Sequence, residues 1–303
     1  MEKRELGNTG MLISVLGLGL AEIPRHEDSS NDLKLASKVL NNALDSGINL
    51  LDTAACYGDT ETMIGTTVSH RRDEYYLATK AGHITGDAKG VPWSGKTIQD
   101  SIDRSLKRLN TDYLDLVQIH TCPMEELLKG EVIEALERAK ELGKTRFIGH
   151  SGDNAEAMWA VESGRFDTLQ TSYNLVEQHA RTKGLLAAAE DKGVGIIVKR
   201  PVGNGAWGKS RSPYPYADEY FRRYGIMSEK GPIADSPASP HILSMGFVLA
   251  SQEVDTVIVG THNPEHVLSN VKLVEEELPI SNRAVLDLYS RFDEHGHDWL
   301  QLT

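Results

Sequence analysis

The chain has 303 residues, of which 40% are hydrophobic and 25% charged, and its formal net charge is -12 at pH 7. These proportions are typical of a soluble globular protein with a full core, and the acidic balance argues against a nucleic-acid or anionic-membrane partner, which would require clustered Lys and Arg. Two cysteines make no disulfide framework, the N-terminus lacks a signal-peptide pattern, and no run of about 18 apolar residues occurs, so we expect a cytoplasmic protein.

The chain opens with a pattern typical of a β-hairpin, two short runs around a Gly-Asn-Thr-Gly turn at 7–10. After it, short apolar runs alternate with longer segments of helical period. The predicted strands are 14–20, 48–51, 75–79, 113–119, 145–149, 168–173, 194–198 and 256–259. The predicted helices are 32–44, 61–68, 97–109, 132–142, 155–162, 182–191, 240–250 and 264–274.

Strict alternation of strands and helices requires a parallel sheet with helices packed over it. Eight such units over about 250 residues predict one α/β domain spanning 1–303, a (β/α)8 TIM barrel with an N-terminal β-hairpin and a C-terminal tail. An open doubly wound sheet is the alternative, but Gly17 and Gly19 lack the third glycine of a dinucleotide-binding fingerprint.

The break at 202–238 is longer than most connections in compact domains. It contains Trp207 and four tyrosines, which would be unusual in a disordered segment. We therefore expect a functional loop over the barrel mouth, with a disordered insertion as the alternative.

Ionisable residues follow several of the predicted strands. Asp52, Lys80 and His120 each end one strand, and Tyr57 follows Asp52 on the next loop. The carboxyl ends of parallel strands share one rim, where ligands bind, so these four side chains are predicted to converge on one pocket. The alternative for Asp52 is that it only caps the following helix.

The chemistry of these four residues is coherent. A nearby ammonium such as that of Lys80 lowers the pKa of a phenol, and Asp52 would keep that ammonium charged. His120 could donate a hydrogen bond to a substrate oxygen. The sequence thus predicts Tyr57 as a general acid that protonates a carbonyl oxygen. None of these groups is a hydride source, so a cofactor must supply one.

Several strings resemble the aldo-keto reductases, in the right order and over nearly the whole chain. They are Asp52-Thr-Ala-Ala-Cys-Tyr57-Gly58 with Glu61 and Gly65, Thr79-Lys80, Asp112-Tyr-Leu-Asp-Leu-Val-Gln-Ile-His120, Ile148-Gly-His-Ser151 and Leu169-Gln170-Thr-Ser-Tyr-Asn174. The resemblance implies a barrel that binds NADPH, less often NADH, and that reduces aldehydes or ketones, or oxidises alcohols, without a metal. It also implies a catalytic tetrad of Asp52, Tyr57, Lys80 and His120, with Tyr57 as the general acid/base.

The resemblance also implies where the cofactor binds. Ser151 and Gln170 would hold the nicotinamide carboxamide, 202–206 the pyrophosphate and 260–270 the adenine end. The cofactor-binding residues predicted in this way are Gly19, Leu20, Ser151, Gln170, Tyr173, Lys199, Arg200, Val202, Gly203, Asn204, Gly260, Thr261, His262, His266 and Asn270.

Three positions depart from the commoner family pattern. Gly152 follows Ser151, where many members have Asn, and Lys199 stands where many members stack an aromatic ring on the nicotinamide. Stacking would then come from Tyr173, or a cation would hold the ring. Histidines stand at the adenine end where Arg is frequent, although Thr261, a histidine and helix N–H groups could still meet a 2′-phosphate. NADP(H) is favoured through the family, with NAD(H) as the alternative.

The leading hypothesis is an NAD(P)-dependent oxidoreductase acting on a small aldehyde, ketone or alcohol, with a sugar among the candidates. Alternatives are a cofactor-holding regulatory or partner module with weak activity, and a lyase in which Lys80 forms a Schiff base. The loops and tail expected around the substrate (22–25, His83, Trp93, Cys122, Trp207 and Trp299) indicate a mixed aromatic and polar pocket that does not name the substrate.

Smaller expectations complete the sequence-based interpretation. His295 and His297 form only a weak metal-binding pattern, so no metal is expected. Cys56 is interpreted as a small buried filler beside Tyr57. A monomer or a weak homo-oligomer is expected.

Overall fold

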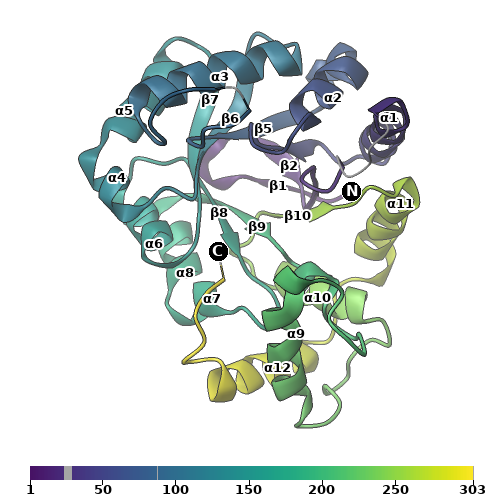
Figure 1. Ribbon diagram of the computed structural model, residues 1–303. Coiled ribbons are helices and arrows are strands. Elements are labelled where there is room, and N and C mark those ends of the chain that lie inside the picture. Colours follow the sequence, from purple (N-terminus) through teal and green to yellow (C-terminus); the bar gives the residue numbers. More distant parts are fainter. Residues whose placement is uncertain (24–28, 87, 303) are drawn as a thin grey trace.

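The computed structural model of the protein describes residues 1–23, 29–86 and 88–302. Within these residues, eight parallel strands close into a barrel in the order β10-β3-β4-β5-β6-β7-β8-β9, and helices surround it (Figure 1). The barrel strands are β3 (Leu16–Gly19), β4 (Leu50–Asp52), β5 (Tyr76–Ala81), β6 (Leu114–His120), β7 (Thr145–Ser151), β8 (Thr168–Ser172), β9 (Gly195–Lys199) and β10 (Thr256–Gly260). The prediction of a (β/α)8 TIM barrel is confirmed, because each of the predicted apolar runs contributes one strand.

The helices differ from the prediction at four places. They are α1 (Ser29–Asp45), α2 (Thr60–Thr67), α3 (Gly95–Leu109), α4 (Met124–Lys129), α5 (Glu131–Glu141), α6 (Asn154–Ser163), α7 (His179–Thr182), α8 (Leu185–Lys192), α9 (Asp218–Ser228), α10 (Pro240–Leu249), α11 (Pro264–Lys272) and α12 (Asn282–His295). The sequence analysis missed α4, α9 and α12. The predicted helix 182–191 is wrong at its start, because Gly184 has a φ of 75° and separates α7 from α8.

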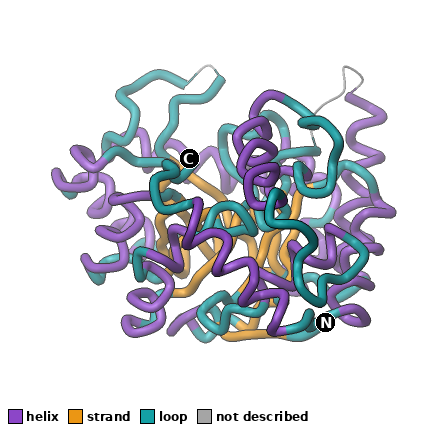
Figure 2. The backbone as a smooth tube through the Cα atoms, turned by 90° about the horizontal axis from the view of Figure 1, so that it is seen from below, coloured by secondary structure: helices purple, strands orange, loops and turns teal. Residues whose placement is uncertain are grey.

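The N-terminal hairpin closes one end of the barrel. Strands β1 (Lys3–Glu5) and β2 (Leu12–Ser14) pair antiparallel, as predicted. Leu6, Met11 and Ile13 form one apolar cluster with residues from five barrel strands, Leu50, Ala78, Leu116, Ile197 and Ile258. Figure 2 shows the N-terminus at the bottom of the barrel and the C-terminus toward the opposite end. A ligand can therefore approach the barrel interior from the carboxyl ends of the strands.

The 202–238 segment is more ordered than the predicted loop, since it contains α9 and two short 3₁₀ turns, Gly203–Gly205 and Pro215–Ala217. Its Trp207 and Tyr224 rings pack with centroids 4.1 Å apart, and its Tyr214 and Tyr216 rings are stacked at 4.7 Å. The aromatic residues that argued against disorder therefore pack against one another. No helix of the described ranges is long and apolar enough to cross a membrane.

A close contact between α2 and α3 explains Gly65. A Cβ at this position would lie 2.2 Å from the backbone oxygen of Arg108, too close for any side chain. We predict that Gly65→Ala lowers the free energy of unfolding by about 1–3 kcal/mol, because the two helices must move apart.

Gly225 supplies the matched control for this substitution. It lies in α9, and no atom lies within 4 Å of the point that a Cβ would occupy, so Gly225→Ala should leave stability unchanged or raise it by up to about 1 kcal/mol. Thermal and urea unfolding of both variants checks the pair. An equal shift of both in the same direction would contradict the packing argument.

Candidate active site

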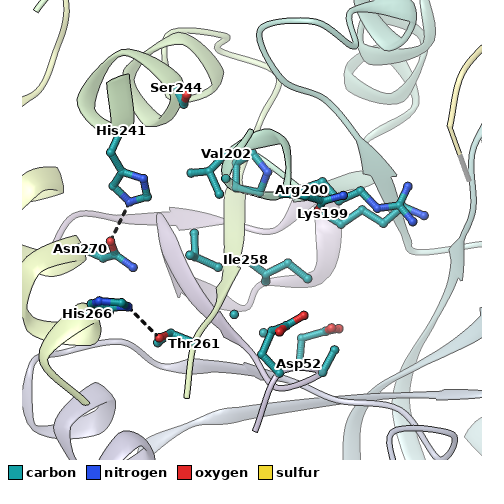
Figure 3. Close-up of a pocket in the computed structure, with 18 of the residues that line it drawn as sticks. Asp52, Lys199, Arg200, Val202, His241, Ser244, Ile258, Thr261, His266 and Asn270 are labelled. Atoms are coloured by element: carbon teal, nitrogen blue, oxygen red, sulfur yellow. Dashed lines mark hydrogen bonds between the residues drawn. The ribbon is translucent and has the colours of Figure 1, made fainter. Parts of the chain in front are cut away.

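A cavity of about 1180 Å³ lies at the carboxyl ends of the barrel strands. Residues at the ends of several strands line it, among them Gly19, Asp52, His120, Ser151 and Gln170. Figure 3 shows part of this cavity, with Asp52 on one side and the side chains of α10 and α11 on the other. The cavity is larger than the usual range of small-molecule sites, about 300–1,000 Å³, and is large enough for a ligand of dinucleotide size.

The four predicted catalytic residues come together at this cavity. Lys80 Nζ donates to Asp52 Oδ2 at 2.5 Å and to the backbone oxygen of Thr53 at 3.0 Å. The Lys80 ammonium lies 5.2 Å from the centre of the Tyr57 ring. The rings of Tyr57 and His120 meet edge to face, with centroids 6.0 Å apart. Tyr57 and His120 line the cavity, while Lys80 is only 2% exposed behind them.

The turn between β4 and α2 fixes the position of Tyr57. Its backbone oxygen accepts a hydrogen bond from the Thr60 hydroxyl at 2.5 Å, and Gly58 has a φ of 58°, which favours glycine. Glu61, at the start of α2, is fully buried and accepts from the Thr79 hydroxyl of β5 at 2.7 Å. The loop that carries the phenol is therefore tied to the strand that carries Lys80.

Two amides satisfy the other oxygen of Asp52. Gln170 Nε2 donates to Asp52 Oδ1 at 2.8 Å, and Gln118 Nε2 donates to it at 3.2 Å. The Oε1 atom of Gln170 accepts in turn from Ser151 Oγ at 3.2 Å. The sequence analysis missed Gln118, although a polar residue inside the apolar run 114–119 was a usable signal.

The charges around Lys80 and Tyr57 give one expected and one unexpected result. Burial acts to lower the pKa of Lys80, but Asp52 and Tyr57 hold it above its ordinary value, so the ammonium stays charged. Lys80 acts most strongly on Tyr57 and lowers its pKa, yet burial, Asp52 and Cys56 together outweigh it and raise the pKa above 10.0. The expectation of a lowered phenol pKa is therefore wrong, and Tyr57 carries its proton at neutral pH.

His120 is a neutral imidazole. Burial, followed by Lys80 and His83, lowers its pKa to about 2. The indole of Trp93 donates to the backbone oxygen of His120 at 3.1 Å, and the His83 ring stands at right angles to its ring with centroids 4.8 Å apart. His83 and Trp93, expected on the substrate side, therefore lie beside His120.

The position of Cys56 corrects another expectation. Its side chain is exposed rather than a buried filler, and its Sγ lies 3.4 Å from Nδ1 of His120. The other cysteine, Cys122, is buried.

Most of the predicted cofactor residues line the cavity. They are Gly19, Leu20, Ser151, Gln170, Lys199, Arg200, Val202, Asn204, Gly260, Thr261, His262, His266 and Asn270. Gly203 is not among the lining residues, although its neighbours on both sides of the chain are.

Tyr173 is directed away from the cavity. Its side chain is fully buried, its ring packs against Phe247 of α10 with centroids 5.4 Å apart, and its hydroxyl accepts from Ser251 Oγ at 3.2 Å. Side chains alternate along β8 and its continuation, so Tyr173 faces opposite to Gln170, three residues earlier. The structure thus gives no support to stacking of Tyr173 on a nicotinamide.

The far end of the cavity carries imidazoles from three segments. His266 Nδ1 lies 3.2 Å from the hydroxyl of Thr261, and His241 Nε2 lies 2.8 Å from Asn270 Oδ1 (Figure 3). His262 lines the same end. His241 and Ser244, three residues apart on α10, also line the cavity and were missed, because α10 was interpreted only as a barrel helix.

A buried carboxylate holds Lys199. Its Nζ lies 2.8 Å from Asp153 Oδ2. The other oxygen of Asp153 accepts from the Ser172 backbone N–H at 2.7 Å and from Thr171 Oγ1 at 3.0 Å. Burial acts to raise the pKa of Asp153, but Lys199, Ser172 and Arg200 bring it below its ordinary value. Burial lowers the pKa of Lys199 below its ordinary value, although Asp153 acts to raise it.

Arg200 forms its hydrogen bonds away from the centre of the cavity. Its guanidinium donates to Ser172 Oγ at 3.2 Å and to the backbone oxygen of Leu302 at 3.0 Å. In Figure 3 it extends away from Ile258 and His266. At the end of β9, Lys199 is thus held by an ion pair and Arg200 by hydrogen bonds to uncharged oxygens.

Two further hypotheses can be compared with this geometry. The Schiff-base role for Lys80 is disfavoured, because a buried, ion-paired and protonated amine is not a nucleophile. Within residues 1–23, 29–86 and 88–302, we find no group of three or more His, Cys, Asp or Glu side chains arranged to hold a metal ion.

The closed barrel, the cavity at its mouth and the phenol beside a buried Lys–Asp pair are the arrangement expected of a nicotinamide-dependent barrel oxidoreductase. The sequence model of the aldo/keto reductase family matches residues 15–288, and the chain belongs to this family. It is thereby an oxidoreductase of carbonyl compounds that uses a nicotinamide cofactor.

Known relatives are similar over most of their length. The uncharacterized oxidoreductase YqkF of Bacillus subtilis is 28% identical, over 95% of this chain and 98% of its own. The L-galactose dehydrogenase of Arabidopsis thaliana is 29% identical, over 91% and 89%. The holo form of the aldo-keto reductase AKR11C1 from Bacillus halodurans superposes with a TM-score of 0.81 at 28% identity, covering 96% of each chain.

The ion pair between Lys199 and Asp153 generates a stability prediction. Asp153→Asn leaves the Lys199 ammonium without its counter-charge, and Lys199 is only 14% exposed. We predict a loss of up to about 3 kcal/mol in the free energy of unfolding, the lower limit for a broken buried pair, since Lys199 retains some contact with water.

The double variant Asp153→Asn/Lys199→Met is the control for this prediction, because it removes both charges. It should recover much of the lost stability in urea unfolding. A double variant less stable than Asp153→Asn alone would show that the charge pairing is not the reason.

Proposed function

We propose that this protein is an NADP(H)-dependent reductase of small polar aldehydes or ketones, able to oxidise the corresponding alcohols, with Tyr57 as its general acid and base. The observation that carries the proposal is the placement of Tyr57 and His120 side by side at the cavity, above the buried Lys80–Asp52 pair. The two cavity-facing groups supply a proton and a hydrogen bond at one point, where a carbonyl oxygen would lie.

The chain's own residues would act in the following way in the reductive direction. The bound cofactor supplies the hydride. His120, neutral because its pKa is about 2, donates a ring N–H to the carbonyl oxygen and orients it. Tyr57 transfers its hydroxyl proton to that oxygen as negative charge develops there. In alcohol oxidation the same two groups would work in reverse.

Lys80 and Asp52 would support the phenolate that Tyr57 leaves behind. The ammonium, 5.2 Å from the ring centre, stabilises the negative charge, and Asp52 keeps the ammonium charged inside the barrel. The raised pKa of Tyr57 keeps the proton on the phenol until the substrate oxygen becomes basic enough to take it. Gln118 and Gln170 hold the Asp52 carboxylate by hydrogen bonds. Asp52 and Lys80 are therefore in place beside Tyr57 before any substrate binds.

The residues present along the cavity fit a dinucleotide. Ser151 and Gln170, at the inner end, offer a hydroxyl and an amide for the nicotinamide carboxamide. Val202 and Asn204 would flank the pyrophosphate, and the stem of Lys199 would offer methylene groups where other members place an aromatic ring. The adenosine end would lie against Thr261, His266 and the start of α11, where helix N–H groups favour an anion.

A polyhydroxylated substrate, such as an aldose or its lactol, suits the other side of the site. The groups next to His120 are polar or mixed: Cys56, His83, Trp93 and Thr121, with His83 Nε2 3.0 Å from the Thr121 hydroxyl. Hydroxyl and imidazole groups can hydrogen-bond to the hydroxyls of a substrate. They therefore favour a polyhydroxylated substrate over an apolar, steroid-like one. The relative named L-galactose dehydrogenase agrees with a sugar as substrate.

The central prediction concerns the phenol. Tyr57→Phe should reduce kcat by about 10²–10⁴-fold, the usual contribution of a general acid, and leave the Kd of the cofactor unchanged. Steady-state turnover on a panel of aldehydes and aldoses, with nucleotide fluorescence for binding, measures both. Tyr113→Phe, outside the cavity, is the matched control.

Two outcomes would contradict the proposal in different ways. Near-normal turnover of Tyr57→Phe would remove Tyr57 from its role as acid. Tight cofactor binding without turnover of any carbonyl by the unmodified protein would favour the regulatory or partner module instead.

A second prediction concerns the choice of cofactor. We expect NADPH to bind more tightly than NADH, with Thr261 and His266 meeting the 2′-phosphate. His266→Ala should then weaken NADPH binding about tenfold or more, the value of a hydrogen bond to a charged group, and should change NADH binding little. Fluorescence titration with both nucleotides tests this. Equal or tighter binding of NADH would make NAD(H) the cofactor and leave the proton-transfer mechanism untouched.

A further inference from the structure

The proposed role of His120 requires one particular tautomer of its ring. A neutral imidazole carries a single proton, on either Nδ1 or Nε2, and the nitrogen without it can only accept a hydrogen bond. To orient a carbonyl oxygen, the ring must donate from the nitrogen that faces the substrate. Something in the site must therefore decide which nitrogen holds the proton.

Cys56 contacts one of the two ring nitrogens of His120. Its Sγ lies 3.4 Å from His120 Nδ1, within hydrogen-bond distance for sulfur. Among the residues that the structure describes, we find no other hydrogen bond to the His120 ring. Nδ1 thus faces the thiol, and Nε2 is left to meet a ligand.

The other contacts of His120 hold the ring without choosing a tautomer. Tyr57 and His83 approach it through their ring faces and edges, with centroids 6.0 Å and 4.8 Å away. Trp93 donates to its backbone oxygen rather than to its ring. The direction of the hydrogen bond between Cys56 and Nδ1 therefore sets the tautomer.

The protonation states of the two partners leave two possible directions, and the strength of the acceptors favours one of them. Although the Cys56 side chain is exposed to solvent, partial desolvation by the surrounding atoms raises the pKa of its thiol above 9.0, against the opposing effect of Lys80, so the thiol keeps its proton at neutral pH. The pKa of His120 is about 2, so the ring is not a cation. The contact is a pairing of a neutral thiol with a neutral imidazole. The thiol is a weak donor and its sulfur a weak acceptor, but an unprotonated imidazole nitrogen is a far stronger acceptor than sulfur, so S–H to Nδ1 is the favoured arrangement.

We infer that Cys56 is a positioning residue: its S–H donates to Nδ1 of His120 and thereby keeps the imidazole proton on Nε2, the nitrogen that donates to the substrate oxygen. The inference rests on the proposed function. Cys56 directly precedes Tyr57, the proposed acid. The same turn of the chain would therefore supply the proton, from Tyr57, and set the tautomer of His120, through Cys56.

The direct test reads the tautomer itself. Protein labelled with ¹⁵N-histidine gives a long-range ¹H–¹⁵N spectrum in which the protonated and unprotonated ring nitrogens are distinct, and loss of a signal set in His120→Asn assigns His120. We expect the Nε2–H form in the unmodified protein and in Cys56→Ser, whose hydroxyl also donates. Cys56→Ala should show a substantial population of the Nδ1–H form. An Nδ1–H form in the unmodified protein, or an unchanged tautomer in Cys56→Ala, would overturn the inference.

Kinetics supply the functional readout. Cys56→Ala should lower kcat/KM for the carbonyl about two- to tenfold, the usual value of one hydrogen bond, with the Kd of NADPH unchanged, and Cys56→Ser should restore it. Unchanged kcat/KM in Cys56→Ala, with Tyr57→Phe inactive, defeats this inference and leaves the proposed function in place. An active Tyr57→Phe defeats the proposed function instead.

Discussion

The buried ion pair between Lys80 and Asp52 is the interaction on which the site depends. Taking two charges out of water costs several kcal/mol for each ion, and the attraction offsets this only when the remaining donors and acceptors are satisfied. Here they are, because Asp52 accepts from Lys80, Gln118 and Gln170, while Lys80 also donates to the Thr53 backbone. The pair places a permanent positive charge beneath Tyr57, and the raised pKa of Lys80 shows that this charge persists.

The register of the barrel makes this arrangement possible. Lys80 is paired with Gln118 across β5 and β6, and Ser151 is paired with His120 on one side and with Gln170 on the other. Neighbouring strands therefore deliver their inward polar residues at the same height. The apolar cluster under the hairpin fills the opposite end of the barrel, so the polar groups gather at one mouth. A shift of one strand by one residue would turn its polar group outward.

The side of the cavity that carries Lys199 and Arg200 is tied to the C-terminal segment. Gln301 donates to Asp153 at 3.4 Å and accepts from the Asn154 backbone N–H at 3.1 Å, and Arg200 donates to Leu302. Arg223 and Glu177, both buried, hold Leu300 and Leu302 by their backbone atoms. The segment after α12 thus packs behind the ion pair of Lys199 and Asp153 and forms part of the cavity wall there.

The sequence by itself determined the barrel, the order of its strands and the four residues at its mouth. Alternating apolar runs can be buried only in a parallel sheet covered by helices, and polar strand ends such as Asp52, Lys80 and His120 must then meet on one rim. What the tertiary structure decided were distances and directions. The raised pKa of Tyr57, the burial of Tyr173, the capture of Lys199 by Asp153 and the contact of Cys56 with His120 all depend on atoms far apart in the chain. A pattern of residue types fixes which groups lie at the mouth, but desolvation and pairing act over a few ångströms, and only the packed fold sets those separations.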